Sequence, residues 1–600
     1  MDTVLSANIY RQMVGLWRLA RKAYAPYKKQ ILALTSLGFL GGILEGIGIN
    51  AVIPLLSSVL GLHDAATDTL SIFIKDFFVW MHVPFVPRYM LAFIVILFIL
   101  KAAITLWISY IQITIANEYL RATQSKLFKM IMRASWPYLL RQKLGNLETA
   151  LMIDTPASTQ LLIKSSSAIT LITSLLMYLI VAFSISAPVM ISTLLIGILT
   201  FALLRPLMDR VNVRSRTRTV LFRDTMHHVG EHVGGLKSIK AFGVEAEAID
   251  RAEGLFSGIM SMTNRIGFTQ ALATQAVAPI GIIYIAAILS LSLKTPFISF
   301  AALPAILYLI YRIFTYIQQL QNTLQYMSEI GPHLERVVHF SENASVGAEA
   351  PGGDQPYSFT RELSFNDVSF AYEQGKEVLH TVSFTIPKGS MVGIVGPSGA
   401  GKTTCVDLML RLLKPTNGAI ELDGVASSEI ALSEWRAHVA YVSQDFFIVH
   451  GTIRDNICFY DETLTDDDIW EAARMAHIDE FIRSNPKGLE TEVGERGIML
   501  SAGQRQRIVI ARALARKPSL LILDEATSAL DNESEAHIKR VIQELKGRIT
   551  VVAIAHRLST IMGSDKLVVL SDGKVAETGS PKDLLADTNS YFYKVYTIAQ

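Results

Sequence analysis

A glycine-rich loop separates a short apolar run from a helical pattern in the C-terminal half of the chain. The run is 391–395, the loop begins at Gly396, and the helical pattern covers 404–413. Successive backbone N–H groups in such a loop, with a helix N-terminus behind them, bind phosphate anions, and glycines permit the close approach. The loop is therefore predicted to hold a triphosphate through Gly396, Pro397, Ser398, Gly399, Ala400, Gly401, Lys402, Thr403 and Thr404. Within it, Lys402 is expected to reach the β- and γ-phosphates and Thr403 to ligate Mg²⁺.

A second apolar run, 520–523, ends in two adjacent acids, Asp524 and Glu525. Asp524 is expected to complete the Mg²⁺ shell through water, and Glu525 to polarise the attacking water as general base. Many strands end in an acidic residue at the surface, so this pair alone is a weak signal. Together with the phosphate loop it predicts a site that hydrolyses ATP.

The chain that must position these residues is too long for one core and too apolar for an ordinary soluble protein. Its 600 residues are 50% hydrophobic and only 18% charged, which favours several domains and a membrane location. Six apolar runs are each close to the length that crosses a bilayer: 31–62, 89–116, 161–185, 189–207, 266–293 and 297–320. The predicted fold is thus an α-helical membrane bundle of six transmembrane helices plus an α/β domain of the P-loop type.

Lysine and arginine counts give the orientation, because cytoplasmic loops hold the excess. The connections after the second and fourth runs are strongly basic, while the others carry little beyond Lys75 and Lys294. Both termini are therefore expected in the cytoplasm. The predicted domains are an interfacial N-terminal helix (1–30), a transmembrane domain with long cytoplasmic extensions (31–340), a linker (341–356) and a nucleotide-binding domain (357–600).

Charge and cysteine content exclude two other classes. A formal net charge of +2 does not favour nucleic acid as a partner. Cys405 and Cys458 are the two cysteines, and they imply no disulfide framework.

The residues 500–504, Leu-Ser-Ala-Gly-Gln, followed by Arg-Gln-Arg, resemble the signature of ABC transporters. With the loop and the acid pair, the whole chain resembles a half-transporter of the exporter type. The resemblance implies an ATPase coupled to transport, with ATP and Mg²⁺ as cofactors. It also implies that four signature residues face a partner subunit's nucleotide: Ser501, Ala502, Gly503 and Gln504. Ala502 stands where the family usually has glycine.

Further positions match the family one by one. Tyr372 resembles the aromatic residue that stacks on adenine, and Gln444 the glutamine that senses Mg²⁺ and the attacking water. Asp531 closes a loop, 528–531, that resembles the one linking the two ATP sites. His556 resembles the switch histidine that bonds the γ-phosphate. The segments 138–154 and 230–245 resemble the coupling-helix regions, and 491–497 resembles the stretch that contacts them.

The resemblance implies an obligatory dimer in a bacterial inner membrane. Two identical chains would form two competent sites, so a homodimer is expected, and a heterodimer with a similar half remains open.

Two ionisable residues in the middle of apolar runs, Glu45 and Arg312, indicate a functional site in the membrane. They either pair with each other or hold cargo. A polar and aromatic face on the sixth run suits an amphiphile, and the stretches 44–55 and 309–312 are similar to bacterial flippases of lipid-linked oligosaccharides. An exporter of peptides or hydrophobic drugs is the alternative. A siderophore importer is less favoured, and the six apolar runs argue against a soluble ABC ATPase that acts on DNA or ribosomes.

Overall fold

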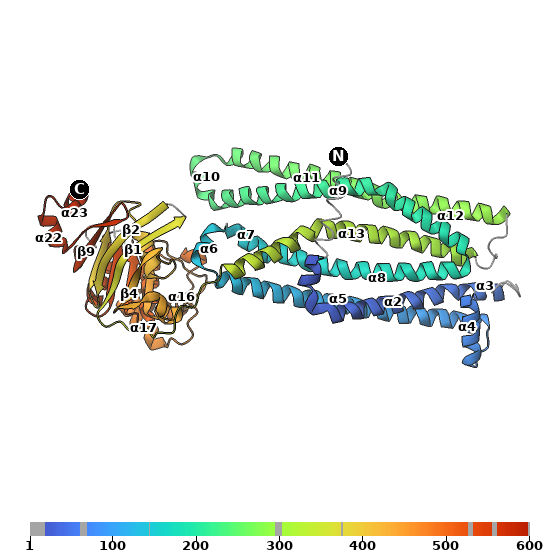
Figure 1. Cartoon of the computed structure of the whole chain (residues 1–600), viewed down its shortest axis with the longest axis horizontal. Helices are drawn as coiled ribbons and strands as arrows, with labels where there is room; N and C mark the ends of the chain where they lie inside the picture. The colour runs from blue at the N-terminus through green and yellow to red at the C-terminus, as the bar shows by residue number, and fades with distance from the viewer. Residues whose placement is uncertain are drawn as a thin grey trace. The chain divides into compact units, whose positions relative to one another are not determined.

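The computed structural model describes residues 18–59, 69–142, 144–294, 303–373, 376–525, 532–554 and 561–597 (Figure 1). The chain divides into two compact units. The helical unit comprises Met1–Ala134 with Arg141–Ala348, and the α/β unit comprises Ser135–Leu140 with Glu349–Gln600.

The helical unit confirms the predicted membrane bundle. Within the described residues, five helical stretches are long and apolar enough to cross a membrane: Ala25–Val59, Pro87–Met132, Gly145–Ile185, Ala187–Gly234 and Glu245–Leu291. The sixth long helix is α13, Leu303–Val346. Residues 295–302, which contain the start of the sixth apolar run, lie outside the described part of the chain.

Short helices subdivide or connect these stretches, and the one at Trp136–Arg141 belongs mostly to the α/β unit. The elements are η1 (Ala25–Tyr27), α2 (Lys28–Asn50), α3 (Val52–Val59), α4 (Thr69–Trp80), α5 (Pro87–Met132), α6 (Trp136–Arg141), α7 (Leu144–Thr149), the π-helical turn η2 (Ala150–Asp154), α8 (Thr155–Ile185), α9 (Ala187–Gly234), α10 (Leu236–Phe242), α11 (Glu245–Gln275) and α12 (Val277–Lys294). α8 and α9 are separated by Ser186 alone, whose backbone is extended. The third and fourth apolar runs therefore form a tight hairpin.

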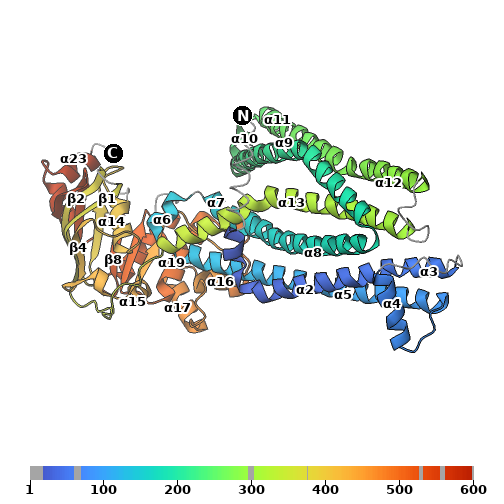
Figure 2. The same cartoon turned by 45° about the vertical axis from the view of Figure 1, so that its right-hand side comes forward.

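Three helices are much longer than a bilayer is thick. α5 has 46 residues, α9 has 48 and α13 has 44. At about 1.5 Å per residue each is more than 60 Å long, about twice the roughly 30 Å of the hydrocarbon core. The helices therefore continue beyond the membrane, and α13 extends into the stretch expected as a linker. α9, α10 and α11 form one of these extensions as a hairpin (Figures 1 and 2).

Glycines let α2 approach two neighbours closely. A Cβ on Gly42 would lie 3.1 Å from the Met177 side chain of α8, and one on Gly46 would lie 2.9 Å from Val181. On the adjacent face, a Cβ on Gly48 would lie 3.1 Å from Phe98 of α5. Small residues at helix interfaces replace the hydrophobic driving force that is absent in lipid. α2 is thus enclosed between α5 and α8.

The sequence analysis did not predict α4, which lies in the connection between the first two runs. Ile74 and Phe78 of this helix are buried, whereas Phe73, Val79 and Trp80 are 60%, 67% and 75% exposed. α4 therefore adds an amphipathic element with an uncovered apolar face to this connection.

The α/β unit contains two sheets. The larger one has the order β10-β9-β3-β8-β7-β6, and the smaller has β2-β1-β4-β5. Their strands are β1 (Glu362–Glu373), β2 (Lys376–Pro387), β3 (Met391–Val395), β4 (Asn417–Leu422), β5 (Val425–Ala426), β6 (Val439–Val442), β7 (Leu520–Asp524), β8 (Thr550–Ile554), β9 (Lys566–Ser571) and β10 (Lys574–Gly579). β9, β3, β8, β7 and β6 are parallel, and β3, β7 and β8 are buried along their whole length, as expected of a parallel sheet covered on both faces.

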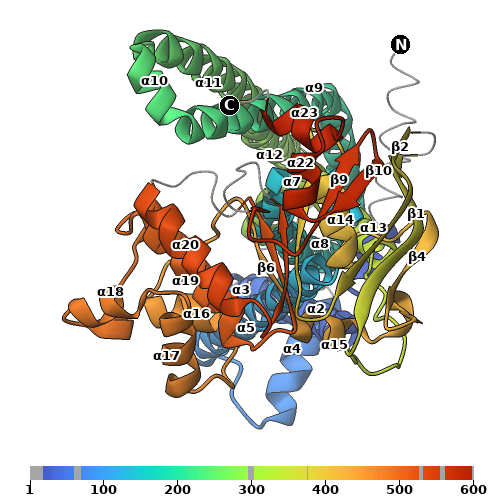
Figure 3. The same cartoon turned by 90° about the vertical axis from the view of Figure 1, so that its left-hand side faces the viewer.

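Helices cover this sheet. They are α14 (Lys402–Met409), α15 (Leu432–His438), α16 (Ile453–Cys458), α17 (Asp466–Met475), α18 (Asp479–Ser484), α19 (Ala502–Ala515), α20 (Asn532–Leu545), α22 (Pro581–Ala586) and α23 (Tyr591–Thr597). Figure 3 shows α16 to α20 gathered on one side of the unit, and β1, β2 and β4 on the other. The predicted α/β domain is confirmed.

The glycine packing of α2 yields a prediction. Gly46→Leu should lower the unfolding temperature of the detergent-solubilised chain by several degrees, because forcing a side chain into a packed interface costs about 1–3 kcal/mol. Intrinsic fluorescence during heating measures it. Gly267→Leu on α11 is the control, since a Cβ there would meet nothing within 4 Å. Equal unfolding temperatures for the two variants would contradict the packing role of Gly46.

Candidate functional site

The predicted nucleotide residues converge on one edge of the large sheet. Parallel strands end at the same edge, so the loop after β3, the residues after β6 and the acids at the end of β7 emerge side by side. This is the edge at which open α/β sheets bind their ligands. The arrangement brings the phosphate loop, Gln444, Asp524 and Glu525 together in the α/β unit.

The phosphate loop has the backbone that its glycines predict. Gly399 and Gly401 have φ values of 82° and 98°, a region that only glycine enters without strain. A Cβ on Gly396 would lie 2.2 Å from the carbonyl oxygen of Leu570 in β9. By contrast, a Cβ on Gly399 would meet nothing within 4 Å. The loop is thus packed tightly against the sheet at its start and open at its centre, where phosphate oxygens can approach the backbone.

Lys402 begins α14 and points back over the loop. Its Nζ donates to the carbonyl oxygens of Gly396 and Pro397, at 2.9 and 3.0 Å. Burial lowers the pKa of its ammonium group, while the carboxylates of Glu525 and Asp524 act in the opposite direction. The cation and the two acids are therefore near neighbours, as a site for a magnesium triphosphate requires.

Asp524 and Glu525 differ in surroundings. Asp524 is 7% exposed and accepts a hydrogen bond of 3.3 Å from the Tyr441 hydroxyl of β6. Glu525 is half-buried, has a positive φ of 49°, and donates its backbone N–H to Ile554 of β8. A non-glycine residue in the left-handed region is uncommon, and such residues gather at functional sites as well as in turns. The sharp turn redirects the chain directly after Asp524.

Asp407 on α14 is a third acid at this site, which the sequence analysis did not single out. Burial, followed by the charge of Asp524, raises the pKa of Asp407 to about 6. Asp407 lies one turn beyond Thr403, on the same and least buried face of α14, and this spacing from the predicted Mg²⁺ ligand could have indicated it.

The remaining predicted residues of the α/β unit lie as follows. Gln444 is exposed, on the segment that leaves β6 beside Asp524. Tyr372 is 42% exposed, and its hydroxyl lies 3.3 Å from the Thr404 hydroxyl, so its ring stands beside the phosphate loop. Asp531 and His556 lie outside the described residues.

The signature residues start helix α19. Ser501 is the N-cap: its hydroxyl accepts from the Gln504 N–H at 3.2 Å, and the Gln504 side chain accepts from the Ser501 N–H at 2.9 Å. Ala502 occupies the first helical position, where alanine is more favourable than glycine. Just before them, Ile498 and Met499 are 79% and 70% exposed. The start of α19 is thus rigid and flanked by uncovered apolar side chains.

In the helical unit, Glu45 and Arg312 contact each other. Arg312 Nη2 donates to Glu45 Oε1 at 2.6 Å, and Glu45 is only 2% exposed. A second cation that the sequence analysis missed, Lys101 of α5, contacts the other carboxylate oxygen. Lys101 stands in the middle of the second apolar run, so the rule that identified Glu45 and Arg312 could also have identified it. Tyr178 and Tyr316 surround the arginine, with ring centres 5.7 and 5.0 Å from the guanidinium carbon.

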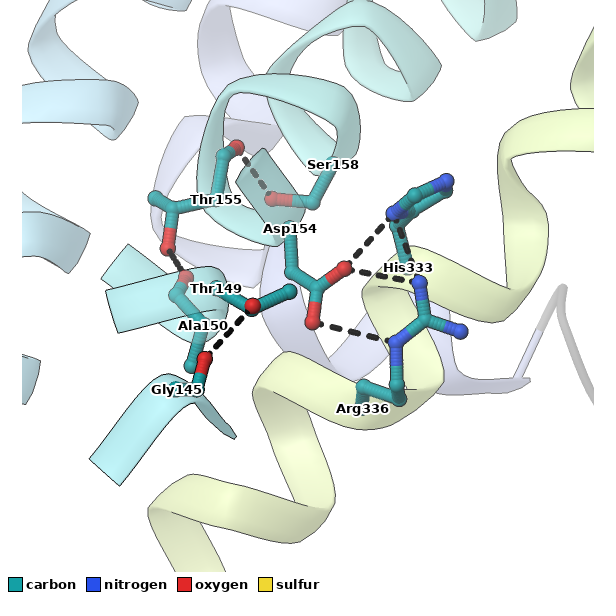
Figure 4. Close-up of polar contacts among 8 residues, drawn as sticks. All are labelled: Gly145, Thr149, Ala150, Asp154, Thr155, Ser158, His333 and Arg336. Atoms are coloured by element: carbon teal, nitrogen blue, oxygen red, sulfur yellow. Dashed lines mark hydrogen bonds and ion pairs between the residues drawn. The ribbon is translucent and has the colours of Figure 1, made fainter. Parts of the chain in front are cut away.

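A second charge cluster joins the start of α8 to α13 (Figure 4). Asp154, the last residue of the π-helical turn η2, is 3% exposed. Its carboxylate accepts two hydrogen bonds from Arg336, at 2.7 and 3.0 Å, and lies 2.7 Å from His333 Nδ1. π-Helical turns are frequent at functional sites. Asp154 is the last residue of the predicted coupling region 138–154. This cluster therefore holds the end of that region against α13.

Comparisons with known proteins agree with this architecture. The ABC transporter family model matches residues 379–528, and the model for the ABC transporter transmembrane region matches residues 52–293. The uncharacterized ABC transporter ATP-binding protein YknV of Bacillus subtilis is 30% identical, covering 96% of this chain and 93% of that protein. The heterocyst differentiation ATP-binding protein HepA of Nostoc sp. is 29% identical over 93% of this chain and 92% of that protein.

Two further relatives extend the comparison. The ATP-dependent lipid A-core flippase of Paraburkholderia xenovorans is 36% identical over 64% of this chain and 66% of the flippase. A solved structure of a bacterial Atm1-family ABC exporter with ATP bound aligns with 96% of this chain and 99% of that one, with a TM-score of 0.75 and 22% identity. The latter shows a shared fold.

The raised pKa of Asp407 yields a pH prediction. Its folded-state pKa of about 6 exceeds the unfolded value near 3.9, so its ionisation destabilises the fold increasingly as pH rises through 6. Without nucleotide or Mg²⁺, Asp407→Asn should therefore stabilise the chain at pH 7.5 by about 1–2 kcal/mol after allowance for solvent screening. The gain should shrink towards pH 5.

Denaturant unfolding at the two pH values measures this gain. Glu462→Gln, at an exposed acid, is the control and should show no such pH-dependent difference. A gain for Asp407→Asn that is unchanged at pH 5 would refute the assignment.

The Asp154 cluster yields a stability prediction. Asp154→Asn should destabilise the chain by about 1–3 kcal/mol, since it leaves Arg336 and His333 without their buried carboxylate. Thermal unfolding in detergent is the measurement, with the exposed Asp250→Asn as control. If both variants unfold at the wild-type temperature, the cluster does not stabilise the packing of α8 on α13.

Proposed function

The chain belongs to the ABC transporters, and we propose that it uses ATP to move an amphiphilic molecule, such as a lipid-linked glycan, across the bacterial inner membrane. It is an ATPase coupled to transport, with an exporter-type transmembrane region fused to its ATP-binding domain. The observation that carries the proposed cargo is the cluster of Glu45, Lys101 and Arg312 among tyrosines deep in the helical unit. Charged side chains at that depth are costly, so they are rare, usually paired, and often mark a substrate site.

The residues of the phosphate edge fit ATP with Mg²⁺. Within the described residues, the ammonium of Lys402 bonds to two loop carbonyls that a phosphate oxygen can replace. The Thr403 side chain is exposed on the same turn. Bound Mg²⁺ would neutralise phosphate charge. We assign Thr403, Gln444 and Asp524 to holding the metal and Glu525 to orienting and deprotonating the attacking water. Tyr372 offers its ring to the adenine.

We further propose that two copies of the chain form the working unit. The first turn of α19, with the exposed Ser501 hydroxyl and the uncovered Ile498 and Met499, would complete the nucleotide site of the partner subunit. ATP then stabilises the closed pair, because a ligand shifts an equilibrium only by its differential affinity for the two states. In this scheme both termini and both α/β units are cytoplasmic.

The relatives favour a lipid-like cargo and keep one alternative open. The lipid A-core flippases are named for a lipid cargo. YgaD of Bacillus subtilis, which is 29% identical over 98% of this chain, is instead named for multidrug export. An exporter of peptides or hydrophobic drugs is therefore the second candidate.

The test is ATP-dependent movement of a fluorescent, phosphate-bearing lipid in proteoliposomes. Wild type should move the lipid and hydrolyse ATP. Glu525→Gln should bind ATP normally but lose hydrolysis about 100-fold or more, and transport with it, since only the base is removed. The exposed Glu462→Gln is the control. Near-normal hydrolysis by Glu525→Gln would refute the base assignment, and hydrolysis without lipid movement would refute the proposed cargo.

A further inference from the structure

The charges around Glu45 do not balance. One carboxylate, on Glu45, faces two cations, with Lys101 at one oxygen and Arg312 at the other. The described part of the chain shows no second acidic side chain in contact with either cation. We call Glu45, Lys101, Arg312, Tyr178 and Tyr316 the midplane cluster. Its formal charge is +1.

Lys101 lies too far from the ends of its apolar run for its ammonium group to reach the membrane surface. Long basic side chains near helix ends extend to the membrane surface. Lys101, however, lies about 18 Å along α5 from Tyr89 and about 22 Å from Ala116, the two ends of the apolar run. An extended lysine side chain spans only about 6 Å. The positive charge therefore stays within the bundle, where only a counter-anion can offset it.

The two cations are held unequally. Arg312 bonds to Glu45 at 2.6 Å and to the hydroxyls of Tyr178 and Tyr316 at 3.3 and 3.4 Å, and its guanidinium faces both rings. In the described structure, the side chain of Lys101 contacts Glu45 as its one charged partner. The exposed fractions of the two side chains are nearly equal, at 23% for Lys101 and 22% for Arg312, so the difference lies in their bonds. Of the two cations, Lys101 is the one that can turn to another anion without dismantling the cluster.

One buried donor of the cluster lacks a hydrogen bond. Among the described residues, Arg312 Nε has no hydrogen-bond partner, whereas Glu45 Oε2 is in ionic contact with the Lys101 ammonium. An unsatisfied buried donor is costly. A phosphate oxygen is a strong acceptor for both an arginine N–H and a lysine ammonium. The cluster therefore has an unbonded donor on Arg312 and a cation, Lys101, with a single charged partner, and a phosphate can bind both.

We propose that Lys101, assisted by Arg312 Nε, receives an anionic phosphate headgroup of the cargo, an inference that rests on the proposed function and specifies its substrate class. Glu45 holds both cations in place while the site is empty, and competes with the incoming anion for Lys101. The phosphate displaces the carboxylate from Lys101 and brings the net charge near neutrality. Lys101 is thus a specificity-determining residue that favours phosphate-bearing over neutral amphiphiles.

The experiment compares matched lipids in nanodiscs of phosphatidylcholine that contain the full-length chain. One set contains dioleoyl phosphatidic acid, and the other contains dioleoylglycerol, which has the same tails and no phosphate. Inorganic phosphate added to plain nanodiscs tests the headgroup without tails. Native mass spectrometry counts the lipid retained on the protein, and cargo-stimulated ATPase activity is measured in parallel.

Wild type should retain phosphatidic acid about tenfold more than dioleoylglycerol, as one charge-assisted contact in a low-dielectric site warrants. Lys101→Gln should abolish this preference, and Lys101→Arg should restore most of it. The exposed Lys75→Gln on α4 should behave as wild type. Inorganic phosphate should compete weakly, because it lacks the tails.

Glu45→Gln separates a binding role from a purely structural one. If the carboxylate only pairs with cations, its loss should reduce retention of every lipid alike. If it competes with the headgroup, its loss should increase retention of phosphatidic acid several-fold while dioleoylglycerol is unchanged. This variant keeps the proposal falsifiable even if Lys101→Gln folds poorly.

The outcomes test the phosphate site at Lys101 separately from the proposed transport of an amphiphile. Equal retention and equal ATPase stimulation by both lipids would overturn the phosphate site but leave amphiphile transport intact. No retention and no stimulation by either lipid would overturn both. Unchanged phosphatidic acid preference in Lys101→Gln would overturn the assignment to Lys101, and strong competition by inorganic phosphate would overturn the lipid headgroup in favour of a free anion.

Discussion

The parallel arrangement of β9, β3, β8, β7 and β6 is the constraint on which the chemistry depends. Because these strands run in one direction, the loop at Gly396, the exposed Gln444 and the acids at Asp524 share an edge although they are far apart in the sequence. The buried apolar strands supply no chemistry themselves. They fix the spacing of a lysine, a hydroxyl and two carboxylates at one edge, as the proposed binding of a triphosphate requires.

The sequence predicted the parts of this structure whose residue types leave few choices. Gly399 and Gly401 have left-handed backbone, and a lysine followed by threonines after such a loop is typical of phosphate binding. The sequence alone was therefore enough to predict this site. The long apolar runs predicted the bundle for the same reason. α4 was not predicted because it has only 12 residues. So short a segment gives little helical periodicity in the sequence.

The contacts of Glu45 could not be predicted from the sequence for a different reason. Sequence marked Glu45 and Arg312 as buried ionisable residues but left open whether they meet, because the separation between helices is set by packing and not by sequence distance. The glycines of α2 bring α5 and α8 close, and this approach places Lys101 and Tyr178 against the same charges. Asp154 went unnoticed as a site because nothing in its local sequence reveals a partner more than 170 residues away.

α13 carries both charge clusters, and Pro332 lies between them, beside His333. Proline removes one backbone hydrogen bond from a helix and makes that turn easier to bend. The arm from Pro332 to Arg312 is about 30 Å long at 1.5 Å per residue, so a bend of about 6° at the proline would carry the guanidinium some 3 Å sideways. Starting from the 2.6 Å between Arg312 and Glu45, a displacement of that size takes the two atoms beyond hydrogen-bonding distance. A slight flexing near the C-terminal end of α13 would therefore be enough to separate Arg312 from Glu45 inside the helical unit.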